Sequence, residues 1–265
     1  VSPPDRHGNC SLGVSVEATL AACRAAKIII AQINPHMPRT YGDAVLPLRE
    51  IDYAVHITSA LPHHSAEPPS GIYSQIGQQV ASLVQDGDCL QMGIGAIPNA
   101  VLSCLGQHQY LGVHSEMFSD GVIPLIEAGV IDNSRKIIHP GRLVTGFVLG
   151  SRSLYDFVDD NPNVLFLDIE YVNNPAVIRK NSHAVSINSA IQIDLTGQVC
   201  ADSIGKEIYS GFGGQVDFVT GSQLSKGGRS IIALPSTALQ GKESRIVAQL
   251  TAGSGVVTSR AQVDH

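Results

Sequence analysis

The sequence of 265 residues predicts an α/β fold with a mostly parallel sheet covered by helices on both faces. Short apolar runs of strand length alternate along the chain with segments whose apolar residues recur at helical spacing. The 26 glycines and 14 prolines supply the many turns that this alternation needs. Hydrophobic residues make up 43% of the chain and charged residues 15%, which is typical of a folded protein with a large core.

The first part of the chain predicts one helix, two strands and a linker. Residues 12–26 combine the early acidic Glu17 with an alanine-rich run, which favours a helix. Residues 27–33 are a nearly continuous β-branched run, so we expect a buried strand, and residues 52–57 predict another strand. Residues 61–70 contain three prolines, which do not fit inside a helix or a central strand, and we place a domain boundary there.

The rest of the chain repeats the alternation of strands and helices. Apolar residues recur near every 3.6 positions after the linker and predict an amphipathic helix that ends before Asp86-Gly87. Helices are expected at residues 72–84, 98–105 and 122–128. Strands are expected at residues 89–92, 111–114, 164–169 and 230–234.

Charge and cysteine content exclude some classes of function. The formal net charge of −6 argues against broad nucleic-acid binding, which needs a basic surface. The five cysteines are scattered and form no C-x-x-C pair, so we interpret them as buried, reduced thiols. No apolar run approaches the roughly 20 residues of a membrane span, and we expect no membrane partner.

The two ends of the sequence do not resemble the ends of a complete protein. Residue 1 is Val rather than Met, and residues 1–4 look like part of a loop. The last residues follow directly on an apolar run. We therefore expect an internal piece of a longer chain, in which a targeting segment could lie upstream.

A glycine turn, Gly93-Ile-Gly-Ala-Ile-Pro-Asn99, follows the strand at residues 89–92 and opens a helix. Backbone N–H groups at such a helix start can hold a phosphate or an oxyanion. The alternative is a tight turn that needs positive φ and has no ligand. The turn is not a dinucleotide fingerprint, because Pro98 stands where the third glycine would be, and it lacks the lysine of a P-loop.

The carboxylate of Glu116 follows the predicted strand at residues 111–114. Parallel sheets bind ligands beyond the carboxyl ends of their strands, so this carboxylate is a candidate nucleophile. The alternatives are a glutamate favoured by a helix dipole and a plain salt bridge. We interpret His114 as a packing or hydrogen-bonding residue, because no second ligand has metal-site spacing to it, and His63-His64 as solvated.

Two further stretches combine glycine or positive charge with a turn. Residues 209–217 hold three glycines within four positions, which suits either close approach to a ligand or a mobile loop. Lys242 and Arg245 follow the strand at residues 230–234 and could pair with a phosphate, although surface charges are the simpler interpretation.

Taken together, these stretches resemble the acetyl-CoA hydrolase/transferase family of the class I CoA-transferases, and within it the 4-hydroxybutyrate CoA-transferase branch. Ser115 and Ala96 depart slightly from the commonest motif. The matching stretches span nearly the whole chain in one order: residues 1–5 with 7–8, 10–15, 34–42, 93–101, 114–121, 188–189 with 194–198, and 210–217.

The resemblance implies a role for each candidate site residue. Glu116 matches the catalytic glutamate, which forms a glutamyl-CoA thioester in the family. The turn bordering CoA and supplying oxyanion N–H groups corresponds to Gln91, Met92, Gly93, Ile94 and Gly95. Three further positions match contacts with CoA, namely Ile191, Gly214 and Lys242.

The resemblance also implies the architecture. The family fold is two similar α/β domains, with mostly parallel sheets and the active site between them. Residues 1–68 would be the C-terminal part of the first domain. Residues 69–265 would be the second domain, which carries the catalytic glutamate and is incomplete at its C-terminus.

The expected activity is transfer of CoA between a short-chain acyl-CoA and a free acid such as acetate, butyrate or 4-hydroxybutyrate, by a ping-pong mechanism. The alternatives are hydrolysis of the thioester at the same site and a non-catalytic CoA-sensing module. We expect CoA as a substrate, no permanently bound cofactor and no metal. The family further implies a homodimer in the cytoplasm, or in mitochondria if an upstream segment is a transit peptide.

Overall fold

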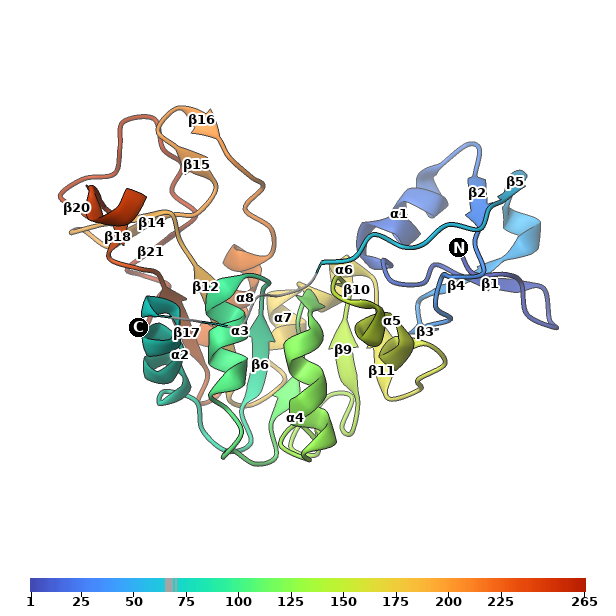
Figure 1. Ribbon diagram of the computed structural model, residues 1–265, viewed down its shortest axis with the longest axis horizontal. Coiled ribbons are helices and arrows are strands. Elements are labelled where there is room, and N and C mark those ends of the chain that lie inside the picture. Colours follow the sequence, from blue (N-terminus) through green and yellow to red (C-terminus); the bar gives the residue numbers. More distant parts are fainter. Residues whose placement is uncertain (65–68, 70) are drawn as a thin grey trace.

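The computed structural model describes residues 1–64, 69 and 71–265 and has one main sheet with an N-terminal region beside it (Figure 1). Four parallel strands form one half of this sheet, in the order β17 (Arg229–Ala233), β12 (Ala184–Ser189), β6 (Cys89–Met92) and β7 (Gly112–Val113). A single bridge between His114 and Val144 joins β7 to a second parallel group.

That second group consists of β9 (Leu143–Thr145), β11 (Val164–Phe166) and β3 (Tyr41–Gly42) in spatial order. Every pairing in both groups is parallel, so the carboxyl ends of the strands meet at one edge of the sheet. This is the edge at which open α/β sheets bind their ligands.

Helices cover both faces of the sheet. Figure 1 shows α2 (Ile72–Ala81), α3 (Ala96–Ser103) and α4 (Ile123–Glu127) in front of it, and α7 (Pro175–Ile178) and α8 (Gln215–Leu224) behind it. The predicted α/β fold with a mostly parallel sheet is therefore confirmed. The core between these layers is apolar, and its fully buried side chains include Leu90, Val101, Leu105, Leu111 and Ile187.

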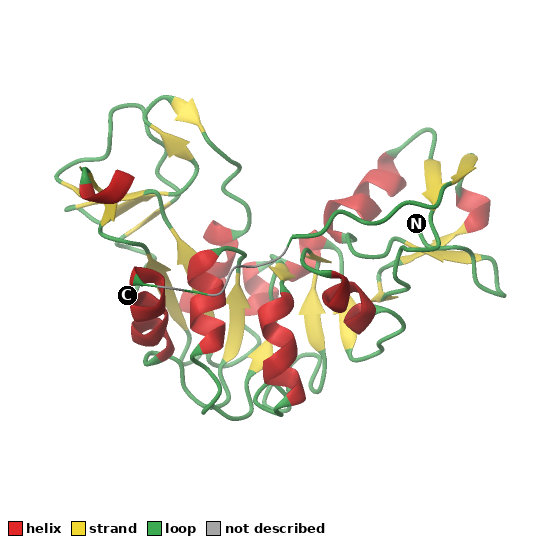
Figure 2. Cartoon of the chain, viewed as in Figure 1, coloured by secondary structure: helices red, strands yellow, loops and turns green. Residues whose placement is uncertain are grey.

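The smaller elements lie around this framework (Figure 2). Helices α5 (Arg152–Val158) and α6 (Ile169–Val172) flank β11, and 3-10 turns occupy Leu48–Glu50, Asp120–Val122 and Leu239–Gly241. Short strands form the remaining sheets: β8 (Met117–Phe118), β10 (Phe147–Val148), β13 (Gln192–Asp194), β14 (Gln198–Cys200), β15 (Ser203–Ile204), β16 (Glu207–Ile208), β18 (Thr237–Ala238), β19 (Glu243–Ser244), β20 (Ile246–Val247) and β21 (Thr258–Ser259).

The N-terminal region contains α1 (Glu17–Ala25), the antiparallel pair β1 (Asn9–Ser11) and β4 (Val45–Pro47), and the parallel pair β2 (Ile30–Ile33) and β5 (Tyr53–His56). Its strand β3 adds to the edge of the main sheet beside β11. The division into domains at residues 68 and 69 stays a prediction, and residues 65–68 and 70 of the predicted linker lie outside the described residues.

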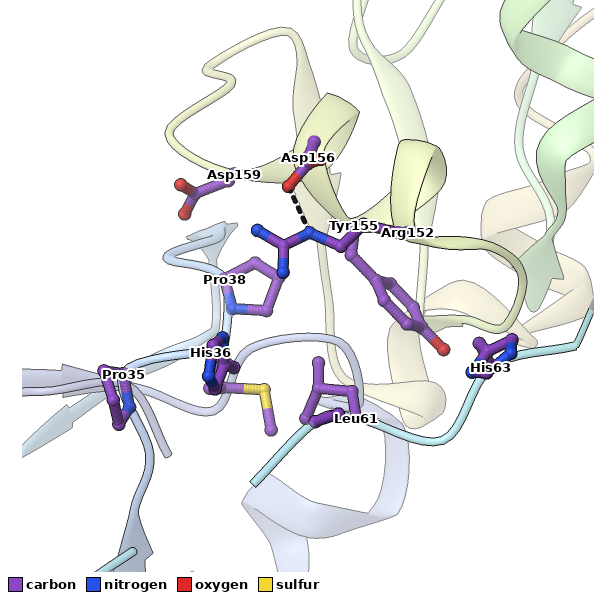
Figure 3. A pocket seen from close by; sticks show the side chains of 11 residues that line it. Pro35, His36, Pro38, Leu61, His63, Arg152, Tyr155, Asp156 and Asp159 are labelled. Atoms are coloured by element: carbon purple, nitrogen blue, oxygen red, sulfur yellow. Dashed lines mark hydrogen bonds and ion pairs between the residues drawn. The ribbon is translucent and has the colours of Figure 1, made fainter. Parts of the chain in front are cut away.

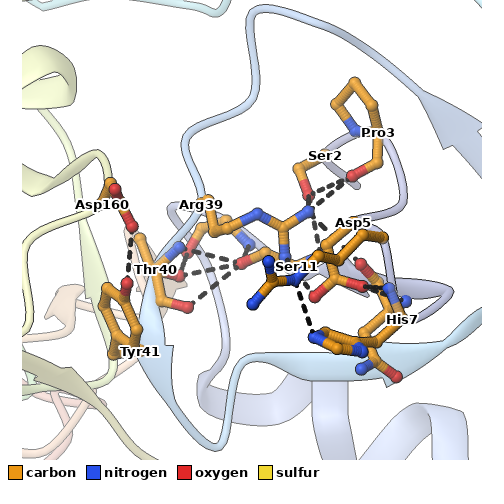
Figure 4. A network of polar contacts seen from close by, with 12 residues as sticks. Ser2, Pro3, Asp5, His7, Ser11, Arg39, Thr40, Tyr41 and Asp160 are labelled. Atoms are coloured by element: carbon orange, nitrogen blue, oxygen red, sulfur yellow. Dashed lines mark hydrogen bonds and ion pairs between the residues drawn. The ribbon is translucent and has the colours of Figure 1, made fainter.

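A polar network holds the N-terminal region together (Figure 4). The Arg39 guanidinium donates to the carbonyl of Pro3 at 2.7 Å and lies 3.6 Å from the Asp5 carboxylate. The Tyr41 hydroxyl donates to Asp160 at 2.5 Å, which links this region to the loop after α5. The stretch at residues 34–42 therefore has a structural role.

Two predictions for this region were partly wrong. The helix begins at Glu17 rather than at residue 12, because Gly13 has a φ of +74° that a helix does not tolerate. The run at residues 27–33 is a strand only from Ile30, whose side chain is 69% exposed. No element among the described residues covers that face, so β-branched composition predicted the strand but not its burial.

Close packing of α2 on α3 gives a test of the fold. A Cβ atom at Gly77 would lie 2.6 Å from the Ala100 carbonyl carbon, so Gly77→Ala should force the helices apart. We expect a loss of about 1–3 kcal/mol in the free energy of unfolding, measured by urea denaturation. The control is Gly106→Ala, where a Cβ meets nothing within 4 Å and should leave stability nearly unchanged. Equal stability of the two variants would contradict this packing.

Candidate active site

The parallel register of β6 and β7 brings the glycine turn and Glu116 to the same edge of the sheet. Leu90 lies opposite Val113, so Gly93 and Glu116, each three residues further along, follow their strands at the same edge. The buried Ser115 hydroxyl continues the ladder, because it accepts from the Met92 N–H at 3.2 Å and lies 2.9 Å from the Met92 carbonyl. Two segments predicted separately from the sequence are therefore held side by side.

The glycine turn has the backbone that its sequence predicts. Gly95 has a φ of +113° and immediately precedes α3, so an L-residue there would be strained. A Cβ atom at Gly93 or Gly95 would meet nothing within 4 Å. The turn therefore borders open space, and the Ile94 side chain is 47% exposed on it. Whether its N–H groups hold an oxyanion stays a prediction.

The Glu116 carboxylate is half-buried and has a defined side-chain partner. The Asn173 amide, at the end of α6, donates to Oε2 of Glu116 at 2.7 Å. A Cβ atom at Gly214 would overlap the same oxygen, and one at Gly213 would lie 3.9 Å from Oε1. The carboxylate therefore lies over the start of α8, where glycines leave room for it. The glycine-rich stretch at residues 209–217 thus meets Glu116.

Two other carboxylates lie close enough to sense the charge of Glu116. Burial raises the pKa of Glu17 and of Asp217, and the negative charge of Glu116 raises both further. Glu17 accepts from the Ser15 hydroxyl at 2.7 Å, and its N–H bonds to the carbonyl of Gly146, whose own N–H bonds to the Glu116 carbonyl. The N-terminal region therefore reaches the site through Glu17.

His114 is a buried neutral side chain, as its sequence context indicates. Its Nε2 lies 2.8 Å from the carbonyl of Val172, and its ring packs 6.3 Å from that of Phe218. Burial, and to a lesser extent the nearby Lys136 cation, lowers the pKa of His114 to about 3. The ring fixes the connection between the Glu116 strand and α6.

The other residues of the predicted CoA turn have separate roles. The Gln91 side chain exchanges two hydrogen bonds with Asn188, at 3.3 and 3.1 Å, which joins the ends of β6 and β12. The Met92 side chain is 2% exposed and belongs to the core. A ligand contact by Met92 would therefore involve its backbone.

Ile191 lines a cavity of about 370 Å³ together with Ser189, Tyr209 and Arg245. Lys242 lies exposed after the turn at Leu239–Gly241 and is not among the lining residues. The structure thus brings Arg245, rather than Lys242, to Ile191. The predicted contacts of Ile191, Gly214 and Lys242 with CoA stay predictions.

A second cavity, of about 240 Å³, lies between the loop at residues 35–38 and α5 (Figure 3). Its wall includes Arg152, which bonds to Asp156 at 2.7 Å, and His63, which is exposed. None of the predicted site residues lines this cavity.

The stretch at residues 194–198 forms a tight turn between β13 and β14. The Asp194 carboxylate accepts from the Thr196 hydroxyl at 2.7 Å and from the Gln198 side chain at 2.8 Å. These hydrogen bonds, that of Thr196 first, hold the pKa of Asp194 well below its usual range. Gly197, with a φ of +80°, closes the turn between β13 and β14.

Asn173 is the site residue that the sequence did not reveal. It lies in the stretch Asn173-Asn-Pro175, where α6 ends and α7 begins. An Asn-Asn-Pro run signals a helix boundary, but nothing local shows that its amide meets a carboxylate 57 residues earlier.

The cysteines have no disulfide partners. All five are free, with Cys10, Cys89 and Cys200 buried and the other two half-buried. Burial raises the pKa of Cys89 to about 11, so this thiol stays protonated and unreactive.

Among the residues that the structure describes, no helix combines the length and apolar character that crossing a bilayer requires.

Comparisons with known proteins identify the family. The model of the acetyl-CoA hydrolase/transferase N-terminal domain matches residues 1–60, and that of the C-terminal domain matches residues 150–265. The chain therefore belongs to the acetyl-CoA hydrolase/transferase family.

Among curated proteins, the chain is 51% identical to 4-hydroxybutyrate coenzyme A transferase of Clostridium kluyveri, over 100% of this chain and 62% of the relative. It is 50% identical to succinyl-CoA:acetate/propanoyl-CoA:succinate CoA transferase of Fasciola hepatica, over 100% of this chain and 56% of the relative. The chain thus spans about three fifths of the length of these relatives.

Solved structures show the same fold. The 4-hydroxybutyrate CoA-transferase of Porphyromonas gingivalis matches with a TM-score of 0.89 and 42% identity, covering 100% of this chain and 62% of that one. RipA from Yersinia pestis matches with a TM-score of 0.94 and 40% identity, covering 99% and 60%.

The buried His114 predicts a specific loss of stability in acid. Its pKa is about 3 in the folded protein against an ordinary value of 6.5, so between these pH values the unfolded chain binds a proton that the folded chain does not. The free energy of unfolding should therefore fall as pH drops, by up to about 1.4 kcal/mol per pH unit from this residue. Urea unfolding at pH 7 and pH 5 should show a smaller acid loss for His114→Gln than for wild type. The exposed His36, changed to Gln, is the control. An unchanged acid loss in His114→Gln would refute this account.

Proposed function

We propose that this protein is a CoA-transferase that moves CoA between a short-chain acyl-CoA and a free carboxylic acid, with Glu116 as the nucleophile. The observation that supports this most directly is the position of the Glu116 carboxylate. It lies at the carboxyl edge of a parallel sheet, at the same edge as a glycine turn, and is bonded to Asn173 at 2.7 Å. The naming of the relatives as CoA transferases agrees with this proposal.

In the first step, the Glu116 carboxylate attacks the thioester carbonyl of the acyl-CoA. The new C–O bond forms as the C–S bond breaks, which gives a mixed anhydride and CoA thiolate. N–H groups of Gly93 and Gly95 are the proposed donors to the developing oxyanion, each contributing roughly 3–4 kcal/mol of barrier lowering. A thiolate is a good leaving group, so no proton donor is required at sulfur.

In the second step, CoA thiolate attacks the glutamyl carbonyl of the anhydride. The free acid leaves as a carboxylate, and a glutamyl-CoA thioester remains on Glu116. An incoming acid then reverses the sequence and departs as the new acyl-CoA. Two covalent steps replace one difficult exchange, and the long CoA tail supplies binding energy that can be used at the reacting carbon.

Asn173 is the positioning residue for the nucleophile in this scheme. Its amide donates to one carboxylate oxygen, Oε2, and leaves the other, Oε1, to attack. Because Asn is neutral, it orients Glu116 without adding to the negative charge of Glu17 and Asp217 nearby.

We infer that the partners are acyl-CoA and short-chain carboxylic acids such as acetate, butyrate or 4-hydroxybutyrate. The 4-hydroxybutyrate and succinate named for the relatives support short-chain acids as a class. The homodimer and the cytoplasmic location stay predictions.

The covalent intermediate gives the central test. Incubation of the full chain with acetyl-CoA, or with other short acyl-CoAs, should add a CoA-sized mass to the intact protein, and borohydride should remove it by reducing the thioester. Glu116→Gln is the control and should form no adduct, because the amide is not a nucleophile. Turnover without any adduct, independent of an added carboxylic acid, would instead support direct hydrolysis. Binding of CoA without turnover would support the sensing module.

The contact between Asn173 and Glu116 gives a second test. Asn173→Ala should lower kcat about 10- to 100-fold, because the carboxylate loses its orientation. Asn173→Asp should be slower still at pH 7, because two adjacent carboxylates repel. Its rate should recover partly as pH falls, when the introduced carboxylate binds a proton and can donate again. Steady-state rates from pH 5 to 8 would check this, and wild-type rates in Asn173→Ala would refute the role.

A further inference from the structure

The strands β7 and β9 are not joined by an ordinary ladder near Glu116. Their only bridge among the described residues pairs His114 with Val144. One residue before that bridge, both backbone groups of Val113 bond to side chains. Its N–H donates to Oδ1 of Asn133 at 2.9 Å, and its carbonyl accepts from Nζ of Lys136 at 2.8 Å. Side chains of the loop at residues 131–142 thus stand where a neighbouring strand would be.

Lys136 bonds to both halves of the sheet. Its Nζ also donates to the carbonyl of Arg142, directly before β9, at 2.6 Å. The stem of the side chain runs over Gly112, where a Cβ atom would lie 2.7 Å from Lys136 Cγ. One ammonium group therefore links the last residue of β7 to the residue that precedes β9.

Burial of the charged Lys136 side chain at this position costs free energy. The side chain is 5% exposed, and burial lowers its pKa to about 8. No carboxylate lies within ion-pairing distance of it among the described residues. Its ammonium group is bonded to carbonyls and gains no stability from an ion pair. We therefore consider its effect on the position of the two strands that it contacts.

The loop that carries Asn133 and Lys136 is itself fixed. The N–H groups of Ile137 and Ile138 both donate to the buried Asn181 side chain at 3.0 Å. Asn133 has a φ of +59°, and its carbonyl accepts from the N–H groups of Lys136 and Gly141. The two side chains therefore enter the sheet from a rigid base.

The strands converge immediately beyond these side chains. The Ser115 N–H donates to the carbonyl of Val144 at 3.0 Å, and the Gly146 N–H donates to the Glu116 carbonyl at 2.9 Å. Glu116 is thus held from two sides: its carbonyl is bonded to Gly146 on the β9 side, and the hydroxyl of the neighbouring Ser115 is bonded to Met92 at the end of β6. A change in the spacing of β7 and β9 would therefore move the Glu116 backbone relative to the glycine turn that follows β6.

We propose that Asn133 and Lys136 form a wedge between β7 and β9 that sets the spacing of the two half-sheets and so positions Glu116 against the glycine turn. Both are positioning residues, which act on Glu116 through Val113 and Ser115. The inference rests on the proposed function of Glu116 as the nucleophile.

The test measures the rate at which the full chain forms the CoA adduct with acetyl-CoA. Lys136→Met should slow adduct formation about 100-fold, because a displacement of about 1 Å at a nucleophile has effects of this size. The KM for acetyl-CoA should change less than about threefold, because no CoA contact is touched. Asn133→Gly is the second variant and keeps the test valid if Lys136→Met does not fold. Glycine accepts the positive φ at this position, and loss of the Asn133 contact should slow adduct formation about 10-fold.

Two matched variants separate positioning from loss of stability. Arg229→Met removes a cation that is bonded to the buried Asp88 at the amino ends of β17 and β6, the opposite end of the strands from Glu116. His183→Gly, like Asn133→Gly, removes a side chain at a positive φ, here +56°. Both should form the adduct at the wild-type rate. Wild-type rates in Lys136→Met or Asn133→Gly, or equal slowing in the matched variants, would overturn the wedge alone. Failure of wild type to form any adduct would refute the proposed function together with the wedge.

Discussion

The parallel register of β6 and β7 is the constraint on which the site depends. It brings the segments that carry Gly93 and Glu116 to the same edge of the sheet, although each follows a different strand. The Ser115 hydroxyl maintains this register past the end of the regular ladder, by bonding to the backbone of Met92. Because the pairing is parallel, the segments that follow β6 and β7 leave the sheet at the same edge and enter the same space.

Several carboxylates lie near one another in the site, and Glu116 forms no ion pair with any described residue. The charge of Glu116 raises the pKa values of Glu17 and Asp217, and the direct partner of Glu116 is the neutral Asn173. The Glu116 carboxylate is restrained by the hydrogen bond from Asn173 rather than neutralised by a cation. Such an environment suits the proposed nucleophile, because an ion pair would have to be broken before attack.

The N-terminal region is tied to the main sheet by packing and by polar contacts at several points. Strand β3 pairs with β11, Tyr41 bonds to Asp160, and Arg24 lies 3.5 Å from Asp168. Glu17 starts α1 directly beside Gly146, next to the Glu116 backbone. The stretch at residues 34–42, which contributed to the resemblance, thus supplies two of these ties through Tyr41 and strand β3.

The sequence by itself determined the fold class, the strand at Cys89–Met92 and the turn at Gly93–Gly95, because short apolar runs, helical spacing and glycine act locally. It also determined that Glu116 follows a strand. Only the tertiary structure decided that Asn173 bonds to Glu116, that Lys136 lies buried between two strands, and that Ile30 stays exposed. These features depend on which distant segments lie together, and neither propensity nor periodicity contains that information.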